Sequence, residues 1–148
     1  MVPYLTDFRP RCPPPTPAQR RAVIEGVRAA VAAWREVEAA FLFGSFLEDE
    51  GFRDVDVAVF LANDSPALRE PWSWEASHEP GLHRVLGQPV DLRVINGAPL
   101  GIQFHATGGV LVFARDEEKT ADLVEAVRRR YYDFRPFAQT NLREMLRA

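Results

Sequence analysis

The stretch FLFGSFLEDEGFRDVDVAVFL, residues 41–61, sets the fold that is expected of this chain. An apolar run stops at Gly44, an acidic loop follows, and the segment 54–61 then alternates between large apolar residues and polar or small ones. Such alternation predicts a strand that buries one face in a hydrophobic core. Asp54 and Asp56 lie together on the other face of this strand, which raises the question of what two carboxylates do beside a core.

Other segments supply the rest of the fold. Apolar, β-prone or alternating residues predict three more strands, at 37–43, 89–95 and 108–114. Helical spacing predicts a first helix after Thr16 and Pro17, a short helix at 100–106, and a helix at 117–134 whose pattern continues beyond Pro136. Residues 66–87 contain three prolines and are interpreted as broken helix and loop. The order of elements indicates an α/β (α+β) fold.

Length and composition are those of one compact domain. The 148 residues are 47% hydrophobic and 26% charged, which is typical of globular proteins. The five prolines within residues 10–17 predict a proline-rich lead-in over 1–16, followed by a single domain over 17–148. A net charge of -3 argues against DNA or an anionic membrane as partner. Without a signal peptide, an apolar membrane span or a second cysteine beside Cys12, a cytoplasmic protein with an exposed thiol is expected.

The carboxylates suggest a metal site. Asp54 and Asp56 lie about 7 Å apart along a strand, and Asp91 occupies the polar face of another alternating strand. Pairing of the two strands would bring the three carboxylates together, and a cation is the natural compensation for their charge. Hard oxygen donors suit Mg²⁺ or Mn²⁺, which also accept phosphate oxygens. Asp54, Asp56 and Asp91 are therefore the predicted metal ligands and catalytic residues.

Gly44 and Ser45 provide the other half of a phosphate site. A glycine at the end of a strand lets the backbone approach a ligand, and the following serine offers an N–H group and a hydroxyl. One or two metal ions held by the carboxylates would stabilise an in-line displacement at an α-phosphate, and one aspartate would assist deprotonation of the acceptor hydroxyl. This combination predicts nucleotidyl transfer.

The same residues resemble a known family. Phe43-Gly44-Ser45, then Asp54-Val55-Asp56 on the next strand and Asp91 on a later one, are similar to the motif of polymerase-β-like nucleotidyltransferases. The small size and the helical tail resemble the minimal nucleotidyltransferases that act as antitoxins to HEPN-domain ribonucleases. The resemblance implies a mixed sheet of about four strands flanked by helices, Mg²⁺ and ATP as co-substrate, and transfer of AMP to a tyrosine of a partner HEPN toxin.

The loop between the motif elements leaves other hypotheses open. Family members commonly carry a basic residue soon after the serine, where this chain has the acidic run 48–50, so Arg53 or Arg93 is expected to supply the charge that binds phosphate. The acidic loop also motivates a catalytically inactive antitoxin that neutralises its partner by binding alone. A small-molecule nucleotidyltransferase, such as one that modifies an aminoglycoside, is a third hypothesis, although the chain has little room for a second domain.

Several other residues have simpler interpretations. His78, His83 and His105 do not have the spacing of zinc ligands. Trp72 and Trp74 are expected to pack between helices rather than to stack on an adenine. The arginines 128–130 are interpreted as a solvated helix end. The apolar residues of the tail, Leu142, Met145 and Leu146, suit either a partner or a homo-oligomer.

Overall fold

The computed structural model describes the backbone of residues 11–147, with the side chains of this range apart from 135–142 and 147. Its sheet has four strands in the order β3-β2-β1-β4: β1 (Val37–Phe43), β2 (Val55–Leu61), β3 (Val90–Val94) and β4 (Val110–Ala114). Strand β1 is antiparallel to both β2 and β4, whereas β2 and β3 run parallel. The predicted mixed sheet and its four strands are confirmed.

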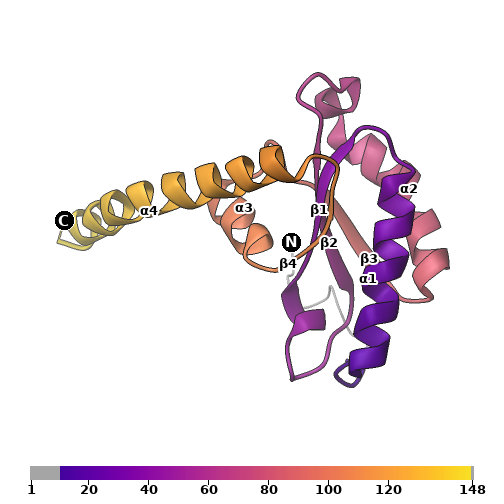
Figure 1. Ribbon diagram of the computed structural model, residues 1–148. Coiled ribbons are helices and arrows are strands. Elements are labelled where there is room, and N and C mark those ends of the chain that lie inside the picture. Colours follow the sequence, from indigo (N-terminus) through magenta and orange to yellow (C-terminus); the bar gives the residue numbers. More distant parts are fainter. Residues whose placement is uncertain (1–10, 148) are drawn as a thin grey trace.

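Helices cover both faces of this sheet (Figure 1). They are α1 (Pro17–Ala32), α2 (Pro71–Leu86), α3 (Leu100–Thr107) and α4 (Glu117–Arg147), with short 3-10 turns at η2 (Gly44–Leu47) and η3 (Pro66–Arg69). Helices α1 and α2 lie on one side of the sheet, and α3 and α4 lie on the other (Figure 1). The chain therefore forms three layers, with the sheet in the middle.

The first helix begins where the sequence predicts it. Thr16 Oγ1 accepts a hydrogen bond from the Gln19 N–H at 3.1 Å, and Gln19 Oε1 accepts one from the Thr16 N–H at 2.8 Å. This reciprocal capping satisfies two N–H groups that a helix start leaves without partners, and Pro17 lacks an N–H that would need one. Residues Val23, Val27 and Val31 then point at the sheet and are buried.

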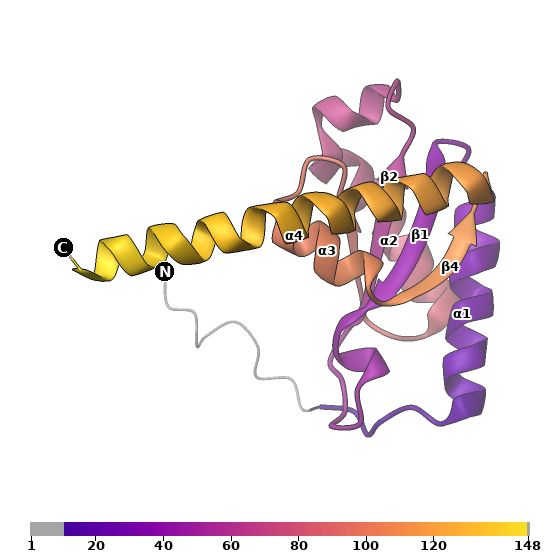
Figure 2. The ribbon, with the colours of Figure 1, turned by 60° about the vertical axis from the view of Figure 1, so that its left-hand side comes forward.

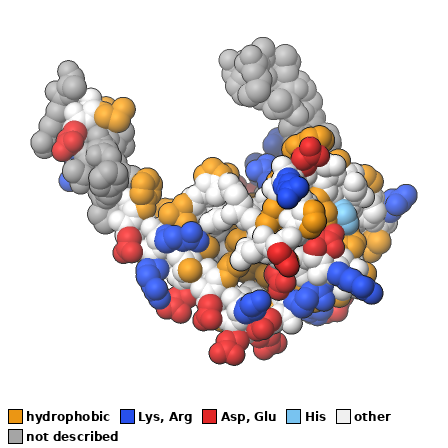
Figure 3. All heavy atoms as spheres, turned by 90° about the horizontal axis from the view of Figure 1, so that it is seen from above, with side chains coloured by type: hydrophobic (Ala, Val, Ile, Leu, Met, Phe, Trp, Pro, Cys, Tyr) orange, Lys and Arg blue, Asp and Glu red, His pale blue; other side chains and the backbone are white. Residues whose placement is uncertain are grey.

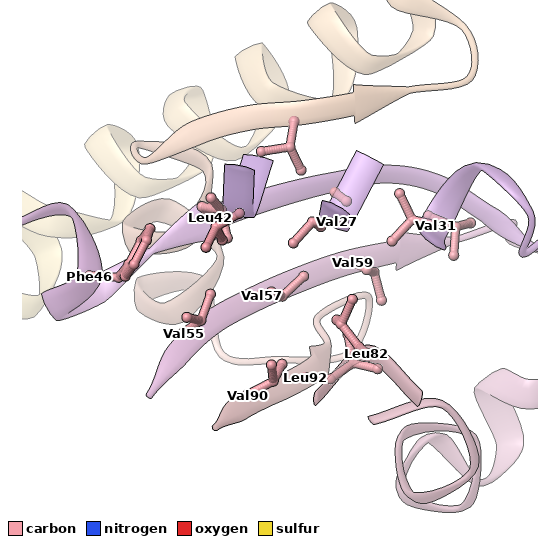
Figure 4. Close-up of a cluster of buried hydrophobic side chains, with 14 of the residues drawn as sticks. Val27, Val31, Leu42, Phe46, Val55, Val57, Val59, Leu82, Val90 and Leu92 are labelled. Atoms are coloured by element: carbon pink, nitrogen blue, oxygen red, sulfur yellow. The ribbon is translucent and has the colours of Figure 1, made fainter. Parts of the chain in front are cut away.

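The two faces of the sheet form two hydrophobic clusters. Alternate residues of β2, namely Val55, Val57 and Val59, pack with side chains from α1 and α2 (Figure 4). On the opposite face, Phe60 and its neighbours pack against side chains from α4, including Leu123. The middle of the sheet is buried on both faces, and the one polar side chain of β2, that of Asp56, lies near the start of the strand.

Helix α2 differs from the sequence prediction for residues 66–87. It is a continuous 16-residue helix with Pro80 inside it, whereas broken helix and loop were expected. Trp74 and Leu82 are buried against the core, and Gly87 ends the helix with a φ of 64°. Burial of this apolar stripe offsets the one hydrogen bond that Pro80 cannot donate. Trp72, which was also expected to pack, is 67% exposed, so that prediction was wrong.

The outer edge of β3 is closed by α2. Glu79 Oε2 accepts a hydrogen bond from the Leu92 N–H at 3.0 Å, and Glu75 Oε2 accepts one from the Val94 N–H at 2.8 Å. The two glutamates are one helical turn apart, so their side chains reach the strand in parallel. They satisfy edge N–H groups that would otherwise be open to another strand.

Helix α4 is longer than predicted and runs through Pro136 without a break. Its first half lies over the sheet, and its second half projects away from it (Figures 1 and 2). The arginines 128–130 therefore lie in the middle of the helix, and their interpretation as a helix end near its dipole was wrong. No helix in the described part of the chain is apolar enough over a sufficient length to cross a membrane.

The proline-rich lead-in is attached to the loop before β2. The Cys12 N–H donates to the Phe52 carbonyl at 2.7 Å, and the Phe52 N–H donates to the Cys12 carbonyl at 3.1 Å. Cys12 is half-buried against the core rather than exposed as expected. This bridge fixes the chain two residues before Asp54.

Candidate active site

Asp56 and Asp91 lie directly opposite each other on the parallel strands β2 and β3. The two strands start together, with Val55 opposite Val90. Both carboxylates therefore project from the same face of the sheet, one residue after the start of each strand. The other neighbour of Asp56 is Phe43, the last residue of β1. The pairing of β2 with β3 therefore brings together Asp56 and Asp91, two of the three predicted carboxylates.

Gly44 lies against the carboxylate of Asp56. Its φ is 80°, and a Cβ atom added there would lie 2.2 Å from Asp56 Oδ2. Both the left-handed backbone conformation and the close approach exclude side chains at this position. Ser45 follows in η2, a turn that Arg20 of α1 holds by donating from Nη2 to the Leu47 carbonyl at 3.2 Å. Of the predicted phosphate-binding residues, Gly44 thus lies against Asp56, and Ser45 follows it in the chain.

The carboxylate of Asp56 is in an unfavourable electrostatic environment. Burial is the largest cause that raises its pKa from 3.8 to about 6, the charges of Asp91 and Asp54 act in the same direction, and Arg93 opposes them. The same interaction shows that Asp54, one residue before β2, lies close enough to repel Asp56. The ionised form of Asp56 is therefore disfavoured by its surroundings.

Arg93 is engaged with Asp91. Its Nη2 lies 3.0 Å from Asp91 Oδ2, and its Nε donates to the same oxygen at 3.2 Å. Contact with Asp91 raises the pKa of the guanidinium, which stays charged. The sequence placed both residues on one face of β3 but did not predict this ion pair, which arises because residues i and i+2 are neighbours there.

The carboxylates fit a hard divalent cation in their chemistry. Oxygen ligands and surplus negative charge are what Mg²⁺ favours. Among the described side chains, however, no three acidic, histidine or cysteine residues converge closely enough to form a metal site. A cation at Asp56 and Asp91 would also have to compete with Arg93. The ligand set Asp54, Asp56 and Asp91 stays a prediction.

Two cavities lie beside the carboxylates of the site. One, of about 290 Å³, is lined by Gly44 and by residues that sequence reasoning missed, among them Phe104 and His105. The other, of about 310 Å³, is lined by Asp54 and Asp91 together with Glu79 and His83 of α2. Cavities of roughly 300 Å³ and more are in the range of small-molecule sites. The i, i+4 spacing of Glu79 and His83 places them on one helix face. This spacing is the sequence signal that could have indicated that both residues line one cavity.

The remaining polar residues of the motif region lie around the site. Arg53 is half-buried directly before Asp54, and the acidic residues 48–50 are exposed, with Glu48 lining the cavity beside Gly44. His78 lies elsewhere, stacked on Trp74 with ring centroids 4.1 Å apart. Packing of Trp74 therefore agrees with the expectation, and the three histidines are distributed over different surroundings.

Comparison with solved structures finds the same fold. One similar chain is in the structure of a tri-AMPylated Shewanella oneidensis HEPN toxin in complex with MNT antitoxin. It is 15% identical, with a TM-score of 0.59 over 87% of this chain and 97% of that chain. A chain of a toxin–antitoxin structure with AMP-PNP is 14% identical, with a TM-score of 0.65 over 83% of this chain and 98% of that one. At these identities the likeness shows the fold.

A third similar chain comes from the toxin–antitoxin pair MntA and HpeT carrying a double aspartate-to-glutamate substitution. It is 14% identical, with a TM-score of 0.62 over 86% of this chain and 98% of that chain. A search of curated proteins finds no match. The family model described as polymerase beta, nucleotidyltransferase matches residues 27–118, more than half of the sequence. This match includes every residue of the predicted site, and the chain belongs to the polymerase β nucleotidyltransferase family.

Proposed function

We propose that this protein is a Mg²⁺-dependent nucleotidyltransferase that moves AMP from ATP to a tyrosine hydroxyl of a HEPN-type toxin in the cytoplasm and so acts as its antitoxin. The observation that carries the proposal is the in-register pair Asp56 and Asp91 with the Gly44 backbone against it. Membership of the nucleotidyltransferase family gives the reaction class. The names of the similar structures, an AMPylated HEPN toxin with its MNT antitoxin and a complex with AMP-PNP, suggest the acceptor and donor.

Each part of the site has a role in this reaction. Asp54, Asp56 and Asp91 would hold Mg²⁺, which when bound supplies positive charge to the phosphate oxygens. The N–H groups and hydroxyl at Gly44 and Ser45 would orient the donor phosphates. The acceptor oxygen forms a bond to the α-phosphorus as the bond to pyrophosphate breaks, and a carboxylate of the site takes the hydroxyl proton.

The test is transfer of label to a HEPN-type toxin encoded by a neighbouring gene. With ATP labelled at the α-phosphate and Mg²⁺, the toxin becomes labelled, whereas label at the γ-phosphate stays in solution. Asp56→Asn abolishes the transfer, and Asp122→Asn, at an exposed position of α4, leaves it unchanged. Absence of label, or label that survives Asp56→Asn, contradicts the proposal.

A second candidate function is neutralisation by binding alone. The ion pair between Arg93 and Asp91 and the exposed acidic residues 48–50 favour it, because both oppose binding of a metal nucleotide. A ligand that binds the folded state raises the melting temperature. Melting that is unchanged in millimolar ATP with Mg²⁺, together with formation of a stable toxin complex, supports this candidate over catalysis.

A further inference from the structure

A separate cavity of about 560 Å³ lies at the end of the sheet away from the carboxylates. It is bounded by the start of β1, the end of β2 and the first turns of α4. Phe60, Leu61 and Leu123 contribute apolar walls. Figure 3 views the molecule from this end and shows acidic, basic and apolar side chains interspersed over it.

An irregularity in β1 shapes this cavity. Val37 pairs with Leu61 and Ala39 pairs with Phe60, so Glu38 is an extra residue in the strand. A bulge of this kind redirects a side chain and disrupts regular pairing. Glu38, which the bulge places here, lines the cavity and is half-buried.

Three polar side chains that line the cavity have no hydrogen-bond or ion-pair partner in the described part of the chain. Thr120 is 4% exposed, and its hydroxyl makes no hydrogen bond to a described residue, although its backbone N–H donates to Asp116. Glu38 and Asp64 also line the cavity, and no ion pair among the described side chains involves either carboxylate. The Thr120 hydroxyl is not among the described side-chain atoms that are fully buried without a hydrogen bond, so it is open to the cavity and can bind a ligand there.

We propose that this cavity binds a small primary amine with an apolar body. The ammonium group would donate to the carboxylates of Glu38 and Asp64 and to the Thr120 hydroxyl, which accepts. The apolar body would lie on Phe60 and Leu123. Two carboxylates against the single ammonium of Lys119 give the lining a net negative charge, which selects a cation over an anion of the same shape.

This site is distinct from the nucleotide site. Asp56 and Phe60 are four residues apart on β2, which places them roughly 13 Å apart along the strand. No residue lining this cavity lines the cavities beside Gly44 or Asp91. Amine binding is therefore independent of AMP transfer, and either proposal can fail alone.

The test uses two ligands with one shape and opposite charge. Amide NMR titration of the full chain with phenethylamine shifts the signals of Ala39, Leu61 and Leu123, whereas 3-phenylpropionate leaves them in place. Glu38→Gln and Thr120→Val each weaken phenethylamine binding roughly three- to tenfold, the range of a lost hydrogen bond to a charged group. Glu118→Gln, a neighbouring exposed glutamate outside the cavity, and Asp56→Asn leave the affinity unchanged.

Melting curves show which variants fold. If Thr120→Val does not fold, Glu38→Gln, at a half-buried position, is the variant that tests the site. The proposal is overturned if no shifts occur up to on the order of 10 mM phenethylamine, a concentration that detects even weak sites. Equal binding of the two ligands overturns it as well, and so does phenethylamine affinity that Glu38→Gln leaves unchanged.

Discussion

Asp56 and Asp91 face the same side of the sheet from directly opposed positions on two parallel strands. Each strand is apolar on its other face, with Val55, Val57 and Leu92 in the core. The carboxylates are therefore held in place by a buried framework, although burial and nearby negative charge disfavour the ionised form of Asp56. An acid held where its ionised form is disfavoured is the arrangement expected of a functional site.

Gly44 is predicted to be irreplaceable by alanine. A Cβ there meets Asp56 Oδ2 at 2.2 Å and also occupies a backbone conformation with a φ of 80°. Gly44→Ala should lower the free energy of unfolding by about 2 to 4 kcal/mol, since the conformational cost of about 1 to 2 kcal/mol is joined by a clash. Chemical denaturation measures this loss.

Two other glycines separate the conformational cost of alanine from the cost of the clash. Gly87 has a φ of 64° with nothing within 4 Å of an added Cβ, so Gly87→Ala should show the conformational cost alone. Gly97, which has neither feature, should tolerate alanine. If Gly44→Ala costs no more than Gly87→Ala, then the contact between Gly44 and Asp56 has no energetic consequence.

Asp56 should make the metal-free protein less stable as the pH rises. Its pKa is about 6 in the folded state against 3.8 for an ordinary aspartate, so between these values the folded state binds more protons than the unfolded state. The free energy of unfolding then falls as the pH rises from about 4 to about 6. Asp56→Asn, which mimics the neutral acid, should be more stable above pH 6 by on the order of 1 to 2 kcal/mol, after allowance for solvent screening.

Denaturation in the presence of a chelator measures this difference at several pH values. Asp122→Asn, an exposed aspartate on α4, should follow the wild-type curve throughout. A loss of stability in Asp56→Asn above pH 6 would show instead that the ionised carboxylate stabilises the folded protein.

Arg93 should restrain cation binding in the absence of nucleotide. It contacts Asp91 at 3.0 Å, so a metal ion has to displace it or share the carboxylate. Arg93→Gln should bind Mn²⁺ several-fold more tightly in calorimetry, because a competing positive charge has been removed. Arg129→Gln, which breaks a similar ion pair with Glu125 on α4, should have no effect. Weaker Mn²⁺ binding by Arg93→Gln would exclude the competition.

Glu79 should stabilise β3 through its hydrogen bond to the strand edge. Glu79→Ala leaves the Leu92 N–H without its acceptor and should cost about 1 to 3 kcal/mol, and amide exchange at Leu92 should accelerate. Glu79→Gln retains an acceptor oxygen and should recover most of the loss. Equal destabilisation by both variants would mean that the charge, and not the hydrogen bond, stabilises the edge.

The strands could be predicted from the sequence because alternation is a local signal. The pattern at 54–61 indicated β2 almost to the residue, and Thr16 with Pro17 indicated the start of α1. Helix α2 could not be predicted, since Pro80 opposes it locally and burial of Trp74 and Leu82 becomes visible only in the folded chain. The sequence indicated helical spacing on both sides of Pro136, but the absence of a break at Pro136 could not be predicted for the same local reason.

The parts of the candidate site that lie within one strand could be predicted from the sequence. The shared face of Asp54 and Asp56 follows from alternation, but the register that sets Asp91 opposite Asp56 depends on strand pairing. Gly44 contacts Asp56, and His83 and His105 line the cavities beside the site. Each of these arrangements depends on elements that are far apart in the sequence. Local patterns carry no information about such distances.

The mass of the partner toxin is the sharpest test of AMP transfer. A HEPN-type toxin encoded by a neighbouring gene is co-expressed with the wild-type protein, purified and weighed by intact-protein mass spectrometry. The toxin is expected to gain the mass of one or more AMP groups with wild type and with Asp122→Asn, and none with Asp56→Asn. An unmodified toxin that the wild-type protein nevertheless neutralises would contradict the proposed reaction.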